Sequence, residues 1–315
     1  MTTPEALRTA LDAAFPPVQF AMAYGSGVFA QKNHDASTSM IDLVFAVDDP
    51  KQWHAANLER NAGHYSFLKW FGADTITAVQ ENYGAGLYYN TLVPLLNPAV
   101  GNRLIKYGVV STKTLCEDLT AWKTLYLSGR MHKPVSILSA TDGIHAASAQ
   151  NLAHAVHYAL LCLPEKFSRM DLFMKIAGIS YLGDFRMTFG ENPRKVRNIV
   201  EANYPAFQEL YQSHLQNSPF LSPSLSDNDI LVSNAVSPTV HTELLDSLPA
   251  NVARRVGSAE RLADRKVAKK SVQRAVASVV NRYSRSQSIK GIVTAGAVKS
   301  VVYVAQKLQR TYFKR

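Results

Sequence analysis

A short glycine turn and a single aspartate lie close together near the N-terminus. Residues 24–27 read Tyr-Gly-Ser-Gly and end the apolar run 18–23, and Asp42 lies inside the next apolar run, 40–47. Both runs are short and rich in aromatic and β-branched residues, which predicts two β-strands. Backbone amides at glycine can approach a phosphate closely, and a carboxylate can hold Mg²⁺ against the same phosphates. The pair therefore predicts a site for a nucleoside triphosphate and a divalent cation.

The turn and the aspartate have separate expected roles. Gly25, Ser26 and Gly27 would hold the β- and γ-phosphates with backbone amides and the Ser26 hydroxyl, although a Gly-Ser-Gly sequence alone is often an ordinary tight turn. Asp42 is the candidate metal ligand, because a carboxylate in an apolar strand needs a partner to offset its desolvation. A strand, a Gly-Ser turn and an acidic strand in this order are typical of nucleotidyltransferases.

The second carboxylate of the usual nucleotidyltransferase pattern is absent two residues after Asp42, where the chain has Val44. Asp48 lies on the same face, but six residues of strand separate it from Asp42 by about 20 Å, which is too far to share one ion. Asp48 and Asp49 are expected to form a turn before Pro50. The missing ligand must therefore come from elsewhere in the chain, from the nucleotide's phosphates or from water.

Asp184 is the candidate for the second metal ligand and a catalytic role, because it follows Gly183 inside an apolar stretch. An ion pair with Arg186 is an equally good interpretation, since buried charges are usually paired. Glu117 and Asp118 are weaker candidates. They lie early in a predicted helix, where acids complement the helix dipole.

Three basic residues are expected near phosphate. Lys106 lies in a predicted strand, 104–111, which is an unusual place for lysine unless it faces a pocket. Arg130 and Lys133 flank a predicted loop. Each of them alone is more often a solvated surface charge. The nine histidines show no ligand spacing typical of zinc.

Composition places the chain among globular proteins of a reducing compartment. It has 315 residues, 47% of them hydrophobic, and only two cysteines, Cys116 and Cys162, which argues against a disulfide framework. No apolar run is long enough for a membrane span. The first fifteen residues are a poor secretory signal and a weak mitochondrial presequence.

Positive charge is concentrated at the C-terminus. Residues 251–315 hold 16 of the 34 lysines and arginines but only two of the 24 acids, and the rest of the chain is slightly acidic. Residues 298–314 have an apolar face of valine, leucine and tyrosine and a cationic opposite face, which favours a helix lying on an anionic membrane. The alternative is a helix packed on its own domain.

The order of predicted elements indicates an α+β fold. A strand-containing N-terminal half, with helices over 1–15, 53–71 and 115–127, precedes a mostly helical half with strong helical stretches at 149–163 and 196–215. Residues 217–238 contain six serines and three prolines, which predicts a linker or disordered segment.

Several segments, in this order, resemble the mitochondrial phosphatidate cytidylyltransferases of the translocator assembly and maintenance family. The resemblance runs from about residue 17 to the C-terminus and is weakest at 217–238. The segments that carry it are 24–31, 41–50, 64–69, 82–86, 106–109, 129–134 and 181–187.

The resemblance implies a nucleotidyltransferase-type domain followed by a smaller winged-helix-like domain. It implies the reaction of CTP with phosphatidic acid to give CDP-diacylglycerol for cardiolipin synthesis, with Mg²⁺ as cofactor, and peripheral attachment to the matrix side of the mitochondrial inner membrane. The expected boundaries are 1–148 for the first domain, 149–216 for the helical domain, 217–253 for the linker and 254–315 for a basic membrane-associating tail. The anionic membrane is expected to bind 288–315.

Two other functions stay open from the sequence. One is a nucleotidyltransferase that acts on RNA, although no aromatic and basic RNA motif is evident and no nucleic-acid partner is expected. The other is a non-catalytic membrane-bound assembly factor that keeps the fold, because a fold does not fix a function.

Overall fold

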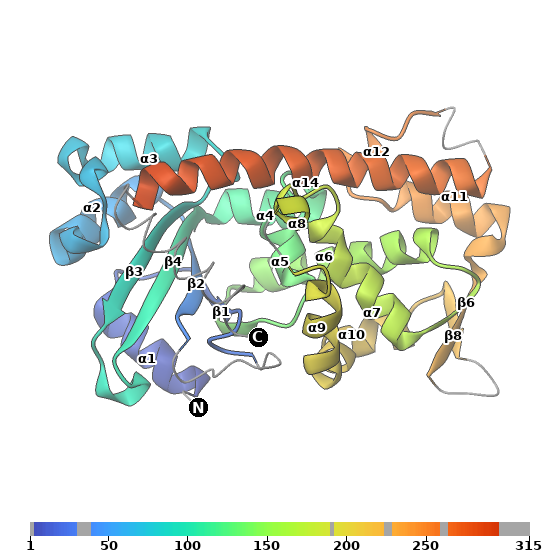
Figure 1. Ribbon diagram of the computed structural model, residues 1–315, viewed down its shortest axis with the longest axis horizontal. Coiled ribbons are helices and arrows are strands. Elements are labelled where there is room, and N and C mark those ends of the chain that lie inside the picture. Colours follow the sequence, from blue (N-terminus) through green and yellow to red (C-terminus); the bar gives the residue numbers. More distant parts are fainter. Residues whose placement is uncertain (1–2, 30–38, 190–191, 224–228, 259–263, 296–315) are drawn as a thin grey trace. The chain divides into compact units, whose positions relative to one another are not determined.

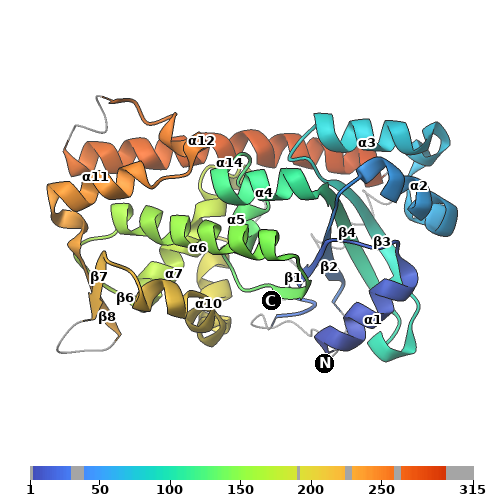
Figure 2. The same ribbon diagram turned by 180° about the vertical axis from the view of Figure 1, so that it is seen from behind.

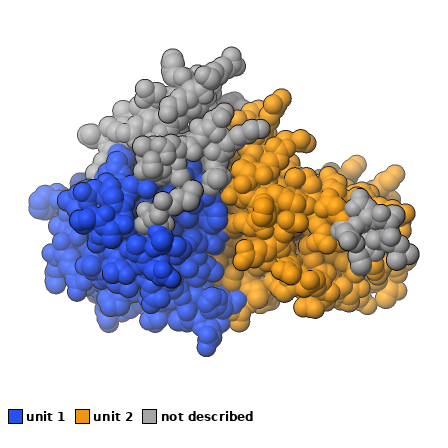
Figure 3. All heavy atoms as spheres, turned by 90° about the horizontal axis from the view of Figure 1, so that it is seen from below, with its two compact units in different colours: residues 1–115, 135–145, 283–315 blue, residues 116–134, 146–282 orange. Residues whose placement is uncertain are grey.

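The computed structural model describes residues 3–29, 39–189, 192–223, 229–258 and 264–295. The chain divides into two compact units, coloured in Figure 3: unit 1 is 1–115, 135–145 and 283–315, and unit 2 is 116–134 and 146–282. The expected mixed α and β fold is confirmed. Within the described ranges, no helix has the length and apolar character needed to span a bilayer. These units follow spatial contacts, and the sequential domain boundaries given above stay a prediction.

Unit 1 is built on a five-stranded sheet, drawn beside α1 in Figure 1. The strand order is β3-β4-β2-β1-β5; β2 and β4 are parallel and the other neighbours are antiparallel. The strands are β1 Phe20–Tyr24, β2 Ile41–Val47, β3 Tyr88–Leu95, β4 Arg103–Ser111 and β5 Ser136–Ser139. The strands predicted around the glycine turn and at 104–111 are confirmed.

One face of this sheet packs on helix α1 (Pro4–Ala14), whose Leu7 and Leu11 join the same buried cluster as Leu43 and Phe45 of β2. Alternate residues of a strand point to opposite faces. Asp42 and Val44 therefore belong to the face away from α1, and the sequence alternation of β2 decides which face carries the carboxylate.

The helix predicted over 53–71 is shorter than expected. Helix α2 (Pro50–Asn61) begins with Asp49 as its N-cap, whose Oδ1 accepts the Gln52 amide at 3.0 Å. Two 3₁₀ turns follow, η1 (Ala62–His64) and η2 (Phe67–Phe71), before α3 (Gly72–Asn82). The apolar residues at 53–71 predicted one helix, but those at 67–71 belong to the 3₁₀ turn η2.

Unit 2 is mostly helical. Pro205 begins a new helix, so the predicted helix 196–215 is two helices, α9 and α10. The elements with most of their residues in unit 2 are α4 Thr112–Ala121, α5 Ser128–Met131, α6 Asp142–Cys162, α7 Arg169–Gly178, η4 Ile179–Tyr181, α8 Arg186–Phe189, α9 Lys195–Ala202, α10 Tyr204–Gln216, η5 Asn234–Val236, α11 Pro238–Asp246 and α12 Ala250–Ala253.

The serine- and proline-rich stretch 217–238 is not only a linker. It carries β7 (Leu221–Pro223) and β8 (Ile230–Ser233), which form a three-stranded antiparallel sheet with β6 (Lys166–Ser168). Composition predicted a loop here, but alternation within β8 buries Leu231 and Ser233 and makes the strand pairing possible. The expectation of a linker across the whole stretch is therefore wrong.

Much of the basic C-terminal region is a packed helix, α14 (Arg265–Ala295), shown in red and orange in Figures 1 and 2. Its buried stripe includes Ala268, Val272 and Val276 in unit 2. The membrane-associating tail expected from residue 254 thus includes a helix with a stripe of apolar residues buried within the protein. The amphipathic helix predicted at 298–314 lies outside the described residues.

Candidate active site

The glycine turn of β1 lies against the carboxylate of β2. A Cβ atom at residue 25 would stand 3.0 Å from Oδ2 of Asp42, and one at residue 27 would stand 2.6 Å from the Met40 carbonyl oxygen. The turn closes with the Phe29 amide donating to the Gly25 carbonyl at 2.9 Å. A side chain at position 25 would press on the Asp42 carboxylate, and one at position 27 would clash with the backbone just before Asp42. Both glycines therefore let the turn approach the start of β2 closely.

Strand register places Lys106 and Tyr24 beside Asp42. Asp42 is the register partner of Tyr24 on β1 and of Lys106 on β4. Lys106 Nζ lies 4.6 Å from the ring centroid of Tyr89, and the Tyr24 and Tyr89 hydroxyls are 3.5 Å apart. A carboxylate, an ammonium group and two phenols therefore share one face of the sheet. Lys106 does lie on a strand, β4, and its expected role near phosphate stays a prediction.

The donor set at Asp42 suits a Mg²⁺ ion that keeps substrate and water ligands. No cluster of three acidic, histidine or cysteine side chains that could hold a metal occurs within the part of the chain described here. Mg²⁺ commonly takes one or two carboxylates and completes its octahedral shell with phosphate oxygens and waters. A half-buried Asp42 beside a turn of backbone amides fits that mode of binding.

Asp184 belongs to unit 2 and has a close partner there. Its carboxylate accepts Arg186 Nη2 at 2.6 Å, Arg186 Nε at 3.0 and 3.1 Å, and the Arg186 amide at 3.0 Å. Gly183 has φ of +79°, and a Cβ there would meet the Ala277 carbonyl of α14 at 2.6 Å. This geometry fits the ion-pair interpretation, and the metal-ligand role of Asp184 stays a prediction.

Asp118, a weaker metal candidate, organises a loop of unit 2. Its Oδ1 accepts the amides of Thr124 and Leu125 at 2.6 and 2.9 Å, and its Oδ2 accepts those of Leu127 and Ser128 at 3.0 and 2.9 Å. A carboxylate saturated by backbone amides has little capacity left for a metal. Asp118 instead holds the start of α5, which carries Arg130.

A group of cations gathers around Tyr181 in unit 2. Lys133 Nζ is buried, donates to the Gly129 carbonyl and to Ser180 Oγ (2.8 Å), and lies 5.2 Å from the Tyr181 ring. Lys195 Nζ lies 5.4 Å from the same ring. Burial, and then the charges of Arg130 and Lys195, hold the pKa of Lys133 well below its usual range. A phosphate would relieve this crowding of positive charge.

Lys195 was missed by the sequence interpretation. It is 62 positions from Lys133 and starts α9 without any motif around it. The folded structure connects it with Lys133, because both ammonium groups lie near the Tyr181 ring and the charge of Lys195 acts on Lys133.

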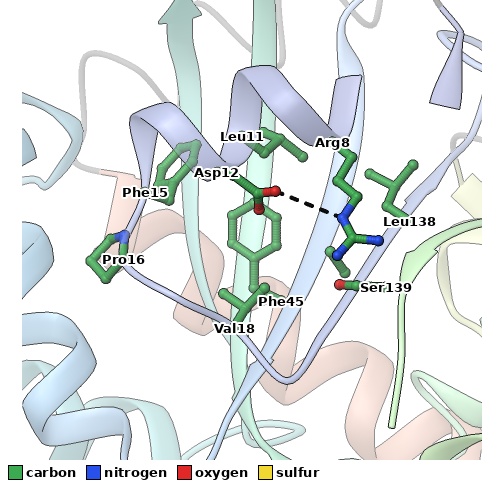
Figure 4. Close-up of a pocket in the computed structure, with 10 residues that line it drawn as sticks. Arg8, Leu11, Asp12, Phe15, Pro16, Val18, Phe45, Leu138 and Ser139 are labelled. Atoms are coloured by element: carbon green, nitrogen blue, oxygen red, sulfur yellow. Dashed lines mark ion pairs between the residues drawn. The ribbon is translucent and has the colours of Figure 1, made fainter. Parts of the chain in front are cut away.

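The pocket in Figure 4 is separate from these residues. It lies between α1 and the sheet and is lined mainly by apolar groups such as Leu11, Phe15 and Phe45, with an Arg8–Asp12 ion pair of 3.7 Å at its edge. None of the predicted site residues lines it, so it is not the candidate active site.

Comparison with known proteins decides the family. A family model described as "Phosphatidate cytidylyltransferase, mitochondrial" matches residues 7–310. The chain belongs to this family. Relatives of the same name include those of Xenopus laevis, 44% identical over 93% of this chain and 90% of its own, and of Bos taurus, 44% identical over 94% and 91%. That of Schizosaccharomyces pombe is 39% identical over 93% of this chain and 80% of its own.

Membership of the mitochondrial phosphatidate cytidylyltransferase family confirms the resemblance drawn from the segments between residues 24 and 187. It does not by itself assign a role to any side chain. The expected roles of Asp42 and Lys106 stay predictions.

Proposed function

We propose that this protein transfers CMP from CTP to phosphatidic acid, which gives CDP-diacylglycerol and pyrophosphate. The observation that carries the proposal is the contact between the Gly25 turn and Asp42, which offers backbone amides and a carboxylate to one triphosphate. The names of the family and of its members support this choice of nucleotide and acceptor.

Catalysis of this reaction depends more on stabilising negative charge than on proton transfer. An oxygen of the phosphatidate phosphate attacks the α-phosphorus of CTP, and a new P–O bond forms. The bond from that phosphorus to the α,β-bridging oxygen breaks, and pyrophosphate leaves with the electron pair. The nucleophile is already an anion near neutral pH, so no strong general base is required. The difficulty is to bring two polyanions together and to stabilise the departing charge.

The chain's own groups can meet this need. The amides of residues 25–27 and the Ser26 hydroxyl would bind the β- and γ-phosphates, and Lys106 would neutralise charge beside them. In unit 2, Arg130 and Lys133, together with Lys195, would supply further positive charge to a phosphate.

Mg²⁺ is the proposed cofactor, with Asp42 as its protein ligand. When bound, the ion would neutralise phosphate charge and stabilise the leaving pyrophosphate. Asp184 is the second candidate ligand and would serve only if Arg186 released it.

We further propose peripheral attachment to the matrix side of the mitochondrial inner membrane through residues 288–315, with the product feeding cardiolipin synthesis. Mitochondrial location is part of the relatives' names. Concentrated positive charge in the C-terminal region suits an anionic lipid surface.

The test is turnover with defined substrates. Full-length protein with CTP, Mg²⁺ and phosphatidate vesicles is expected to release pyrophosphate and form CDP-diacylglycerol, and EDTA is expected to stop the reaction until Mg²⁺ is restored. Asp42→Asn should lower kcat by about a hundredfold or more. Asp48→Asn changes an exposed acid just after the end of β2; it is the matched control and should keep full activity. Full turnover by Asp42→Asn, or transfer of CMP to RNA but not to phosphatidate, would refute the proposal.

A further inference from the structure

An aromatic turn in unit 1 is presented to solvent. Four of the five residues of η2 (Phe67–Phe71) are apolar, yet only Leu68 is used by the core, where it packs with Tyr65, Ile76 and Tyr88. The side chains of Phe67, Trp70 and Phe71 are 52%, 79% and 63% exposed. Three large exposed aromatic residues thus lie within one turn, and apolar groups clustered at a surface usually mark a contact with a partner.

The turn is held in place from beneath. Ser66 caps η2 by accepting the Leu68 amide, and its carbonyl accepts the Lys69 amide at 3.1 Å. Below it, the Tyr65 hydroxyl is within 2.8 Å of both His54 Nδ1 and Asn57 Nδ2. The backbone that carries the aromatic side chains is therefore fixed by hydrogen bonds.

The helix that follows the turn, α3, is held at its C-terminal end by α14. Lys290 Nζ donates to the carbonyls of Gln80 (3.1 Å) and Tyr83 at the end of α3, and Gln287 Oε1 accepts the Ala85 amide at 2.9 Å. Figures 1 and 2 both show α3 and the end of α14 side by side. The aromatic turn and the start of the segment 288–315 are thus parts of the same unit.

The charges around the turn favour a lipid surface as its partner. Lys69 Nζ lies 5.0 Å from the Trp70 ring, a cation beside an aromatic residue. Asp74, the first acid after the turn, is paired with Lys51 at 2.6 Å. Tryptophan and phenylalanine with a neighbouring lysine are the side chains that bind at the boundary between lipid head groups and acyl chains. Ile289 on the outward side of α14 is also exposed.

We propose that Phe67, Trp70 and Phe71 insert into the interfacial region of the bilayer that holds the lipid substrate. This contact is additional to the one proposed for 288–315, and it rests on the proposed function, because that function requires a bilayer-embedded phosphatidate. Aromatic insertion supplies apolar binding energy that salt does not screen, whereas a basic tail supplies charge attraction that salt does screen.

Tryptophan fluorescence tests the insertion directly. The chain has three tryptophans, and Trp53 and Trp122 are 5% and 0% exposed, so Trp70 is the one that can report on solvent or lipid. Full-length protein is mixed with vesicles of phosphatidylcholine and phosphatidate with brominated acyl chains. Insertion should shift the emission to the blue and quench it. Unchanged emission from protein that sediments with the vesicles would overturn the proposal.

Matched variants give the second test. The triple variant Phe67→Ser, Trp70→Ser, Phe71→Ser should lower the vesicle partition coefficient at high salt by about tenfold or more. Leu96→Ser removes an equally exposed apolar side chain elsewhere in unit 1 and should not change it. Unaltered partitioning by the triple variant would refute the insertion. The proposal would also be refuted if the triple variant lost binding to RNA or to a protein and kept its binding to vesicles.

Turnover separates this inference from the function on which it rests. The triple variant should lose activity on phosphatidate vesicles but keep CTP affinity and activity on a water-soluble short-chain phosphatidate. Equal loss on both substrates would contradict a membrane role for the turn. No turnover by the unaltered protein on either substrate would instead refute the proposed function, while the quenching of Trp70 would still report insertion.

Discussion

Gly25 and Asp42 approach each other so closely that a side chain at residue 25 would press on the carboxylate. A Cβ atom at residue 25 would lie 3.0 Å from Asp42 Oδ2, and the backbone there has φ of +80°, a conformation that other residues rarely adopt. Steric space and backbone conformation thus both favour glycine at the point where the turn meets the carboxylate. The turn's amides and the carboxylate can then act on one phosphate group.

Gly25→Ala should impair catalysis beyond its effect on stability. We expect kcat/KM for CTP to fall at least about tenfold and stability to fall by about 1–2 kcal/mol. Gly101→Ala is the matched control, because Gly101 has φ of +73° with no atom within 4 Å of a built Cβ. Steady-state kinetics and thermal unfolding of both variants are the measurements. An equal loss of kcat/KM in the two variants would mean that proximity to Asp42 is unimportant.

The Asp184–Arg186 pair is expected to be structural. Arg186→Gln should destabilise the protein by about 1–3 kcal/mol, since it leaves the buried Asp184 carboxylate incompletely bonded. Asp184→Asn should destabilise the protein less, because Arg186 is partly exposed to solvent. The Mg²⁺ concentration that gives half-maximal turnover should not change in either variant. A rise in that concentration for Asp184→Asn alone would establish Asp184 as a metal ligand.

Stability should depend on pH through His54. Burial lowers its pKa from 6.5 to about 4, and its ring lies between the Tyr65 hydroxyl (2.8 Å) and Gln80 Oε1 (2.9 Å). Between these pKa values the unfolded chain binds the proton and the folded protein does not, so stability is full above pH 6.5 and is lost as pH falls toward 4.

Denaturant unfolding at pH 7 and pH 5 measures this contribution. The unaltered protein should lose about 2 kcal/mol more than His54→Gln over that interval. Other buried histidines, such as His132, titrate equally in both proteins and cancel in the comparison. Equal losses in the two proteins would show that His54 is charged in the folded state.

Two C-terminal deletions should have different effects. Removal of 296–315 should weaken vesicle binding and leave CTP affinity nearly intact. Removal of 288–315 also removes Lys290, which donates to the Gln80 and Tyr83 carbonyls, and should lower thermal stability in addition. Isothermal titration with CTP and vesicle sedimentation distinguish the two. A collapse of CTP affinity on removal of 296–315 would place that segment in the folded core.

Local sequence pattern predicted the elements that carry the glycine turn and Asp42. Strands β1 and β2 are short apolar runs bounded by turn residues, and such signals act over a few neighbours only. The same reasoning failed at 53–71 and at 217–238. In the first, apolar residues served a 3₁₀ turn, and in the second, pairing with the distant strand β6 produced a sheet.

The amino-acid sequence by itself determined the α+β class, the Gly25–Gly27 turn, its aspartate and the family. Tertiary structure decided that Lys106 lies beside Asp42, that Lys195 joins Lys133 around Tyr181, and that Trp70 is exposed. The physical reason is the range of the interactions. Turn and strand preferences arise between adjacent residues, whereas strand register and side-chain burial depend on which distant segments pack together.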